Sequence, residues 1–241
     1  MSHLQRLGGF AALVNAAAYI LGIGLALTLL APVLDSSPEQ YLTFLAENQT
    51  LLYLWHLVIY LVAGVFMVPL VLAVHERLKA GSPALMQIAT VFGLIWAVTV
   101  IGSGMIIVND VGVVADLYGH DPAQAATVLA ALSAVEEGLG GAVELPGGVW
   151  VLLVGWAALK TGGFPKLLNV LGLAVGVAGL LTIVPALHEA GTAFGLGSIA
   201  WFIGAGVALL RGGSRMSAPG AAVQASVGEG VRVDGLEEAK S

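Results

Sequence analysis

Long apolar stretches separated by short polar loops set the pattern of this chain. A helix needs roughly 20 apolar residues to cross a hydrocarbon layer about 30 Å thick. Five stretches have that length, and a further one can be cut from the apolar tract 123–159, which as one helix would be about 55 Å long. The pattern therefore predicts six membrane-spanning helices, over residues 8–31, 51–74, 84–108, 141–159, 166–187 and 194–210.

The fourth apolar tract is divided where Glu136, Glu137 and three glycines interrupt it. Before this break the sequence predicts a short surface helix over residues 121–135, with Asp121 as its N-cap and a proline at its first position. The same signal at Ser37 predicts another short helix after the first span. The expected fold is an all-α, polytopic membrane bundle with two short surface helices on its outer side.

Composition supports the membrane and removes several kinds of chemistry. Hydrophobic residues make up 58% of the chain and charged residues 10%, whereas about 25% of an average soluble domain is charged. So little charge cannot cover a water-exposed surface. The absence of cysteine excludes disulfides, thiolate metal sites and cysteine nucleophiles. A net charge of -6 argues against nucleic-acid binding.

The positions of the basic residues predict how the chain is oriented in the membrane. All 9 Lys and Arg residues lie before the first predicted span, after the last one, or in the loops that follow the second and fourth. Short cytoplasmic loops are enriched in positive charge, so both termini are expected in the cytoplasm and the protein in the plasma (inner) membrane.

Residues 1–211 form the predicted membrane domain. Residues 212–241, rich in Gly, Ser and Ala, are predicted to be a disordered cytoplasmic tail.

The turn between the fourth and fifth predicted spans carries a recognisable motif. Gly162 and Gly163 end one helix, Pro165 begins the next, and Gly172 with Gly176 allows close helix approach. With its flanking residues, 155–179, this motif resembles a bacterial family of six-span integral membrane proteins catalogued only as a domain of unknown function. The resemblance implies a fold and a bacterial membrane, and it brings no catalytic residue.

Glu144 is the ionisable residue placed deepest in a predicted span. Counted along a helix from Lys160, it lies about 24 Å from the inner boundary. Pro146 would free the carbonyl of Ala142, and transporters use such interrupted helices to bind ions or substrates. Intramembrane ionisable groups suggest function. The alternatives are that the carboxyl reaches the outer headgroups or stays protonated against a neighbouring helix.

Other ionisable residues are expected at or just above the same height, namely His56, His188, Glu137, Asp110 and Glu189. Two histidines and a carboxylate, His56, Glu144 and His188, would suit a divalent metal such as zinc, or a proton-binding site. The two histidines could instead ligate haem. His56 follows Trp55 and could be an interfacial anchor, whereas His188 could cap a helix end.

These observations leave three functional hypotheses. The first is a protein that binds or passes a proton, metal ion or small solute at an outward-facing polar pocket. Another is an accessory or scaffolding subunit that packs against other membrane proteins or against itself. An intramembrane enzyme comes last, because the sequence does not place a nucleophile and a base together. Lipid is the expected surrounding in all three cases.

Overall fold

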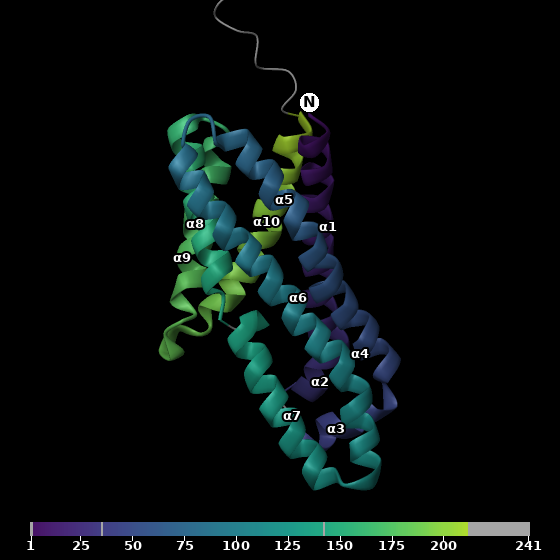
Figure 1. Cartoon of the computed structure of the whole chain (residues 1–241). Coiled ribbons are helices and arrows are strands. Elements are labelled where there is room, and N and C mark those ends of the chain that lie inside the picture. The colour runs from purple at the N-terminus through teal and green to yellow at the C-terminus, as the bar shows by residue number, and fades with distance from the viewer. Residues whose placement is uncertain (1, 35, 142, 212–241) are drawn as a thin grey trace, which may run out of the picture. The chain divides into compact units, whose positions relative to one another are not determined.

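The computed structural model describes residues 2–34, 36–141 and 143–211, and the predicted tail 212–241 lies outside these ranges. Within them the chain forms helices and no strand, which confirms the all-α prediction. Figure 1 shows their arrangement. The helices are α1 (His3–Leu25), α2 (Ala31–Leu34), α3 (Pro38–Glu47), α4 (Gln49–His56), α5 (Ala63–Leu78), α6 (Pro83–His120), α7 (Pro122–Glu136), α8 (Leu145–Thr161), α9 (Lys166–Leu181) and α10 (Ala190–Arg211).

Several of these helices join through π-helical turns, in which each turn holds an extra residue. The segment η1 (Ala26–Leu30) joins α1 to α2, and η2 (Leu57–Val62) joins α4 to α5. A third, η3 (Glu137–Gly141), follows α7, and the 3-10 turn η4 (Pro185–Leu187) follows α9. The stretches from α1 to α2 and from α4 to α5 are therefore nearly continuous helices.

Four helical stretches are long and apolar enough to cross a membrane. They are His3–Val33, Gln49–Leu78, Pro83–His120 and Ala190–Arg211. The other two predicted spans correspond to α8, with 17 residues, and α9, with 16. At 1.5 Å per residue each of these is about 25 Å long, a little short of the hydrocarbon thickness.

The beginning of α8 corrects one detail of the prediction. The helix starts at Leu145 rather than at residue 141, with Glu144 in the N-cap position and Pro146 in the first turn. A proline there lacks only an amide that would have no helical partner anyway, so Pro146 starts the helix and does not break it. Likewise α9 ends at Leu181, before the predicted end at residue 187.

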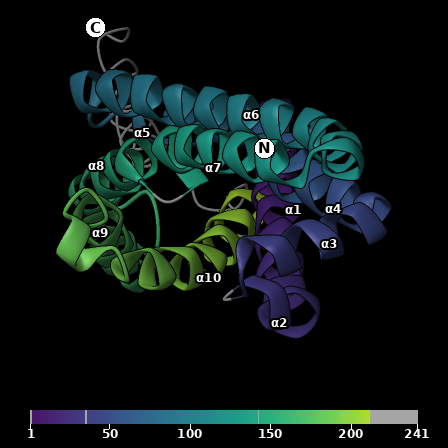
Figure 2. The ribbon, with the colours of Figure 1, turned by 90° about the horizontal axis from the view of Figure 1, so that it is seen from below.

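The helix α6 extends beyond the predicted span. It has 38 residues and continues from the predicted end at 108 to His120. The predicted helices at 121–135 and after Ser37 both form, with Asp121 accepting from the Gln124 amide and a full capping box at Ser37. Seen from below, α7 lies beside α6, with α9 and α10 on the opposite side (Figure 2). Thus α7, which was predicted as a short surface helix, packs along α6.

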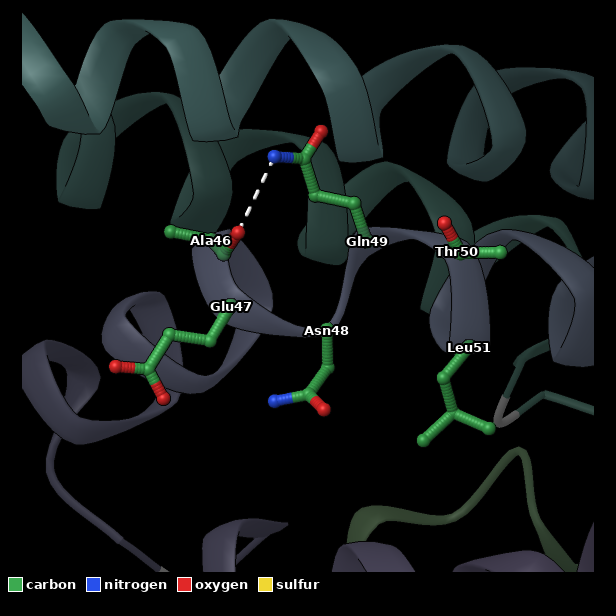
Figure 3. A pocket seen from close by; sticks show the side chains of 6 residues that line it. All are labelled: Ala46, Glu47, Asn48, Gln49, Thr50 and Leu51. Carbon is green, nitrogen blue, oxygen red and sulfur yellow. Dashed lines mark hydrogen bonds between the residues drawn. The ribbon is translucent and has the colours of Figure 1, made fainter.

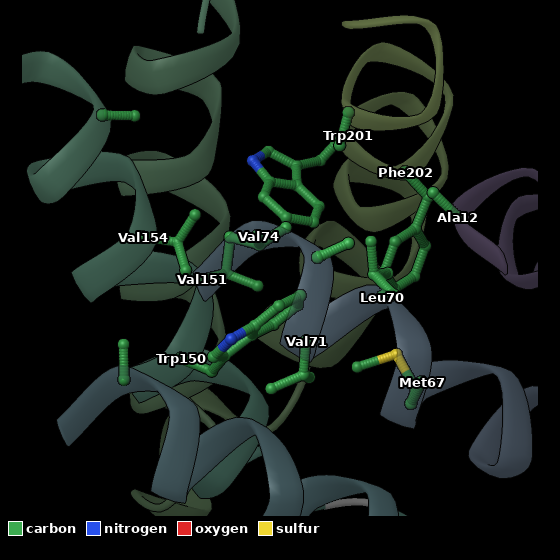
Figure 4. Packing of buried hydrophobic residues seen from close by; sticks show 14 of the residues in the cluster. Ala12, Met67, Leu70, Val71, Val74, Trp150, Val151, Val154, Trp201 and Phe202 are labelled. Atoms are coloured by element: carbon green, nitrogen blue, oxygen red, sulfur yellow. The ribbon is translucent and has the colours of Figure 1, made fainter. Parts of the chain in front are cut away.

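Two separate apolar cores result. The distal core lies where α3, α4, α6 and α7 meet and consists of Leu30, Leu42, Leu45, Leu52, Val111, Val114, Ala115 and Ala125. The main core lies between α1, α5, α6, α8 and α10 and is rich in aromatic rings. Figure 4 shows Trp150 from α8 and Trp201 from α10 packing around α5. Trp96 of α6 contacts this group, with its ring centroid 5.9 Å from that of Trp150.

The helices α8 and α9 touch backbone to backbone through glycines. A Cβ on Gly179 would lie 2.8 Å from the Cα of Gly148, and a Cβ on Gly155 would lie 2.9 Å from the carbonyl oxygen of Asn169. A Cβ on Gly176 would meet the backbone nitrogen of Leu152 at 2.6 Å. The close approach predicted from Gly172 and Gly176 is confirmed.

The turns that carry basic residues meet at one end of the bundle. The Arg77 side chain donates to the Gly163 carbonyl at 2.8 Å, and its guanidinium lies 5.1 Å from the centre of the Phe164 ring. This joins the α5–α6 turn to the α8–α9 turn. The beginning of α1 lies at the same end, where Gly9 approaches Leu210 of α10 (Figure 1).

The glycine contact predicts opposite effects for two Gly→Ala substitutions. Gly176→Ala would place a methyl group against the α8 backbone and should lower the free energy of unfolding by about 1–3 kcal/mol. A Cβ on Gly102 of α6 has no atom within 4 Å. Gly102→Ala should therefore raise the free energy of unfolding by about 0.5–1 kcal/mol through helix propensity. Denaturation in detergent micelles, followed by circular dichroism, measures both. Equal effects of the two substitutions would contradict the packing described for α8 and α9.

Candidate functional site

Glu144 stands at the beginning of α8, in the N-cap position. Its carboxyl makes no capping hydrogen bond to α8. Its backbone N–H donates to the Thr182 hydroxyl at 2.9 Å, and that hydroxyl donates to the Gly179 carbonyl at 2.7 Å. The beginning of α8 is therefore tied to the end of α9. These bonds fix the backbone of Glu144 and leave its carboxyl free for other contacts.

One oxygen of the Glu144 carboxyl is buried, and aromatic side chains lie near it. Its Oε2 atom is inaccessible and has no hydrogen-bond partner among the described residues. The Trp96 indole N–H interacts with the carboxyl, though not in regular hydrogen-bond geometry. The hydroxyls of Tyr19 and Tyr60 lie within electrostatic range of it. Helices α1, α6 and α8 and the π segment η2 thus converge on this carboxyl.

Glycines make the enclosure possible. A Cβ on Gly147 would lie 2.6 Å from the Trp96 ring and 3.0 Å from Phe194. The absence of a side chain there lets the Trp96 indole lie against the first turn of α8. Gly147 and Gly148 thus allow α6, α9 and α10 to approach the first turn of α8.

His56 is the last residue of α4, directly before η2, and only 8% of it is exposed. Its Nδ1 has no hydrogen-bond partner in the described part of the chain. The Trp55 ring lies 4.6 Å from the His56 ring and the Tyr60 ring 6.1 Å from it. The Trp55 indole donates to the Gly22 carbonyl of α1 at 3.2 Å. His56 is therefore a buried residue and does not lie on an exposed interface.

The other predicted site residues do not gather around Glu144. His188 and Glu189 are exposed beyond the end of α9, and Glu137 is exposed in η3. Over residues 2–34, 36–141 and 143–211, no three His, Asp or Glu side chains lie close enough to hold a metal ion. His56, Glu144 and His188 form no such group among the described residues, and metal binding by them stays a prediction.

A separate acidic group lies between α6 and α7. Asp110 is half-buried, its Oδ2 has no partner among the described residues, and its other oxygen accepts from Asn109 at 3.5 Å. The pKa of Glu136 is raised to about 7. Burial is the largest cause, and the carboxylates of Asp110 and Glu137 contribute as well. Burial and Glu136 together raise the pKa of Tyr41 in α3. Glu136 therefore titrates near neutral pH.

A surface hollow occurs at the turn between α3 and α4. Ala46, Glu47, Asn48, Gln49, Thr50 and Leu51 line it. Figure 3 shows the hydrogen bond, 3.2 Å long, from the Gln49 amide to the Ala46 carbonyl. None of the predicted site residues lines this hollow, so it is distinct from the Glu144 site.

Three residues near Glu144 were missed as site residues in the sequence. Tyr60 comes four residues after His56, so the two share a helical face, which is a signal the sequence contained. Trp96 and Thr182 carry no such signal. Each becomes a neighbour of Glu144 only because α6 and α9 pack against the beginning of α8.

Comparison with known proteins gives one match. Residues 6–213 match the family described as "Domain of unknown function (DUF4386)", in agreement with the resemblance of the 155–179 stretch. The family match does not confirm the number of membrane spans. Neither a curated protein nor a solved structure matches the chain.

The raised pKa of Glu136 predicts a pH dependence of stability. The folded protein holds this proton more tightly than the unfolded chain, in which the group titrates near 4.5. The stabilisation is therefore complete below about pH 4.5 and is lost as the pH rises to about 7. In Glu136→Gln this loss should disappear, so the variant should be more stable than the parent above about pH 7.

Melting temperatures in detergent across this pH range, compared between parent and variant, measure the effect. Glu47→Gln, at an exposed position, is the matched control and should keep the parental pH profile. If Glu136→Gln also kept that profile, the acidic environment described for Glu136 would be wrong.

Proposed function

The chain belongs to the DUF4386 family, and we propose that it is a six-span protein of the cell membrane that binds and releases a proton at Glu144. The carboxyl of Glu144 carries this proposal. Its Oε2 atom is buried and has no hydrogen-bond partner in the described ranges. A charged carboxylate in such a place is costly, whereas a protonated one is not.

The helix lengths and the exposed apolar side chains support six spans. Four stretches are long enough, and α8 and α9 pack against each other, with α8 also beside α6 (Figure 1). Large apolar side chains point outward on several of these helices, with Val98 68% exposed, Met105 60% and Leu167 82%. Lipid would cover these surfaces, which water would not favour.

The distribution of charge supports cytoplasmic termini. Arg6, Arg77, Lys79, Lys160 and Lys166 lie toward the end where α1 begins, and α10 finishes at Arg211. The one salt bridge in the described ranges, from Lys79 to Glu76 at 2.7 Å, is also there. The acidic residues of α3, α6 and α7 lie toward the other end. The positive-inside rule then places the basic end in the cytoplasm and the acidic end outside.

A proton suits the site better than a metal ion. Divalent metals need three or more protein ligands, and the described residues provide no such group. A proton needs only one oxygen and no cavity. The hydroxyls of Tyr19 and Tyr60, which can donate or accept, are suitable neighbours for a carboxyl that alternates between its two states.

The topology predicts side-specific labelling. Because the chain contains no cysteine, Ala80→Cys and His120→Cys each introduce a single thiol, at the exposed ends of α5 and α6. A membrane-impermeant maleimide added to intact cells should label His120→Cys, and should label Ala80→Cys only after the cells are opened. The reverse pattern would overturn the orientation, and labelling of both in intact cells would overturn the span between them.

Proton binding is tested by infrared difference spectroscopy of the purified protein in lipid nanodiscs between acid and alkaline pH. On acidification, a carboxylic C=O band of a carboxyl without hydrogen bonds, distinct from the bands of Glu136 and the exposed carboxyls, should appear, should shift in heavy water, and should be absent in Glu144→Gln. Glu189→Gln, which alters an exposed carboxyl, is the control and should retain the band. The proposal fails if the band persists in a folded Glu144→Gln variant or is missing from the parent protein.

A further inference from the structure

The beginning of α8 lacks a capping contact that other helix starts of this chain have. Ser2 precedes α1 and Ser37 precedes α3 with an extended backbone, at ψ of 154° and 152°, and each side chain accepts from an amide of the first turn. This is the usual N-cap geometry. Glu144 has the same place before α8, but its ψ is 33° and its carboxyl accepts from no amide of that helix.

Thr182 holds the backbone of Glu144 in this different conformation. The Thr182 hydroxyl accepts from the Glu144 N–H at 2.9 Å and donates to the Gly179 carbonyl at 2.7 Å. Because its one proton is used by Gly179, the direction of the lone pair offered to Glu144 is fixed. Only 2% of Thr182 is exposed, and the backbone contact between Gly148 and Gly179 lies within one turn of the bond.

Pro146 removes one of the amides that a capping side chain normally uses. A side chain at the N-cap accepts from the N–H of the second or third helical residue. In α8 the second residue is Pro146, which has no N–H, and the third is Gly147. The Gly147 amide is therefore the remaining one of the two that the Glu144 carboxylate could bind.

We infer that Thr182 is a positioning residue, which keeps the Glu144 carboxyl out of hydrogen-bond contact with the α8 amides and so favours its protonated form. This inference rests on the proposed proton binding at Glu144. In the observed position Oε2 is buried and has no hydrogen-bond partner in the described ranges, which disfavours a negative charge.

Opening of the Thr182 bond would favour release of the proton. The backbone of Glu144 is then free to become extended, as it is at Ser2 and Ser37, and the carboxyl turns toward the Gly147 amide. A carboxylate there accepts the N–H and lies at the positive end of the α8 dipole. The proton passes to water, and the bond to Thr182 re-forms when the carboxyl is protonated again.

The test follows the infrared C=O band of Glu144 in lipid nanodiscs as a function of pH. Thr182→Val keeps the shape of the side chain and removes the hydroxyl. Half of the band should then form at a pH lower by about one unit, which is a tenfold loss of proton affinity. Thr182→Ser retains a hydroxyl and should keep the parental pH. Thr127→Val, which removes an exposed hydroxyl on α7, is the matched control and should also keep it.

Pro146→Ala tests the same inference without a change at Thr182. It returns an amide to the second position of α8, so a carboxylate at the N-cap gains a donor. Half of the Glu144 band should again form at a lower pH than in the parent protein. This variant decides the matter if Thr182→Val does not fold.

The outcomes separate this inference from the proposed function. If the band forms at the parental pH in a folded Thr182→Val or Pro146→Ala variant, the inference is wrong while proton binding stands. The same holds if Thr182→Ser shifts the band as far as Thr182→Val does, since the hydroxyl would then not be the cause. If the parent protein shows no Glu144 band at all, the proposed function itself fails.

Discussion

The backbone contact between α8 and α9 is the constraint on which the rest of the structure depends. Glycines on both helices remove the side chains that would separate them, so Gly148 and Gly179 meet directly. That contact brings Thr182 to the beginning of α8, where its hydroxyl holds the Glu144 amide. With its backbone fixed, Glu144 presents its carboxyl to α1 and α6. The position of the polar group thus follows from the packing of apolar, small-residue helices.

Polar atoms without partners cost stability, and their distribution along α6 is informative. Among the described residues such buried atoms include Trp96 Nε1, Ser103 Oγ and Asp110 Oδ2 on α6, and His56 Nδ1 and Glu144 Oε2 next to it. They lie along the region where the main core gives way to the distal core. Elsewhere in the main core, aromatic rings pack against one another, as Trp201 does against Phe202. Trp150 of α8, Asn169 of α9 and Ser198 of α10 also carry such atoms, so the unsatisfied groups are not confined to α6.

The sequence predicted what depends on local signals and composition. Ser37 and Asp121 marked helix starts that the structure contains, and the turn at Gly162 has the left-handed conformation that glycine favours, with φ of 65°. The heights of residues above the inner membrane boundary, which were counted along helices, were predicted less accurately. The height of His188 assumed a continuous helix to residue 187, but α9 ends at Leu181. Pro146 was misread because a proline within an apolar stretch can either break a helix or begin one.

Contacts between distant segments explain what the sequence could not provide. Glu136 and Glu137 are adjacent, yet one is half-buried against α6 and the other exposed, because α7 ends there and η3 changes the direction of successive side chains. Tyr60, Glu136 and Glu144 belong to η2, α7 and the beginning of α8, which lie apart in the sequence and all pack along α6. Because α6 passes through both cores, a shift of α7 along it would move Glu136 relative to Tyr60 without disturbing the glycine contact that holds Glu144. The outer acidic group and the Glu144 carboxyl thus depend on different helix contacts.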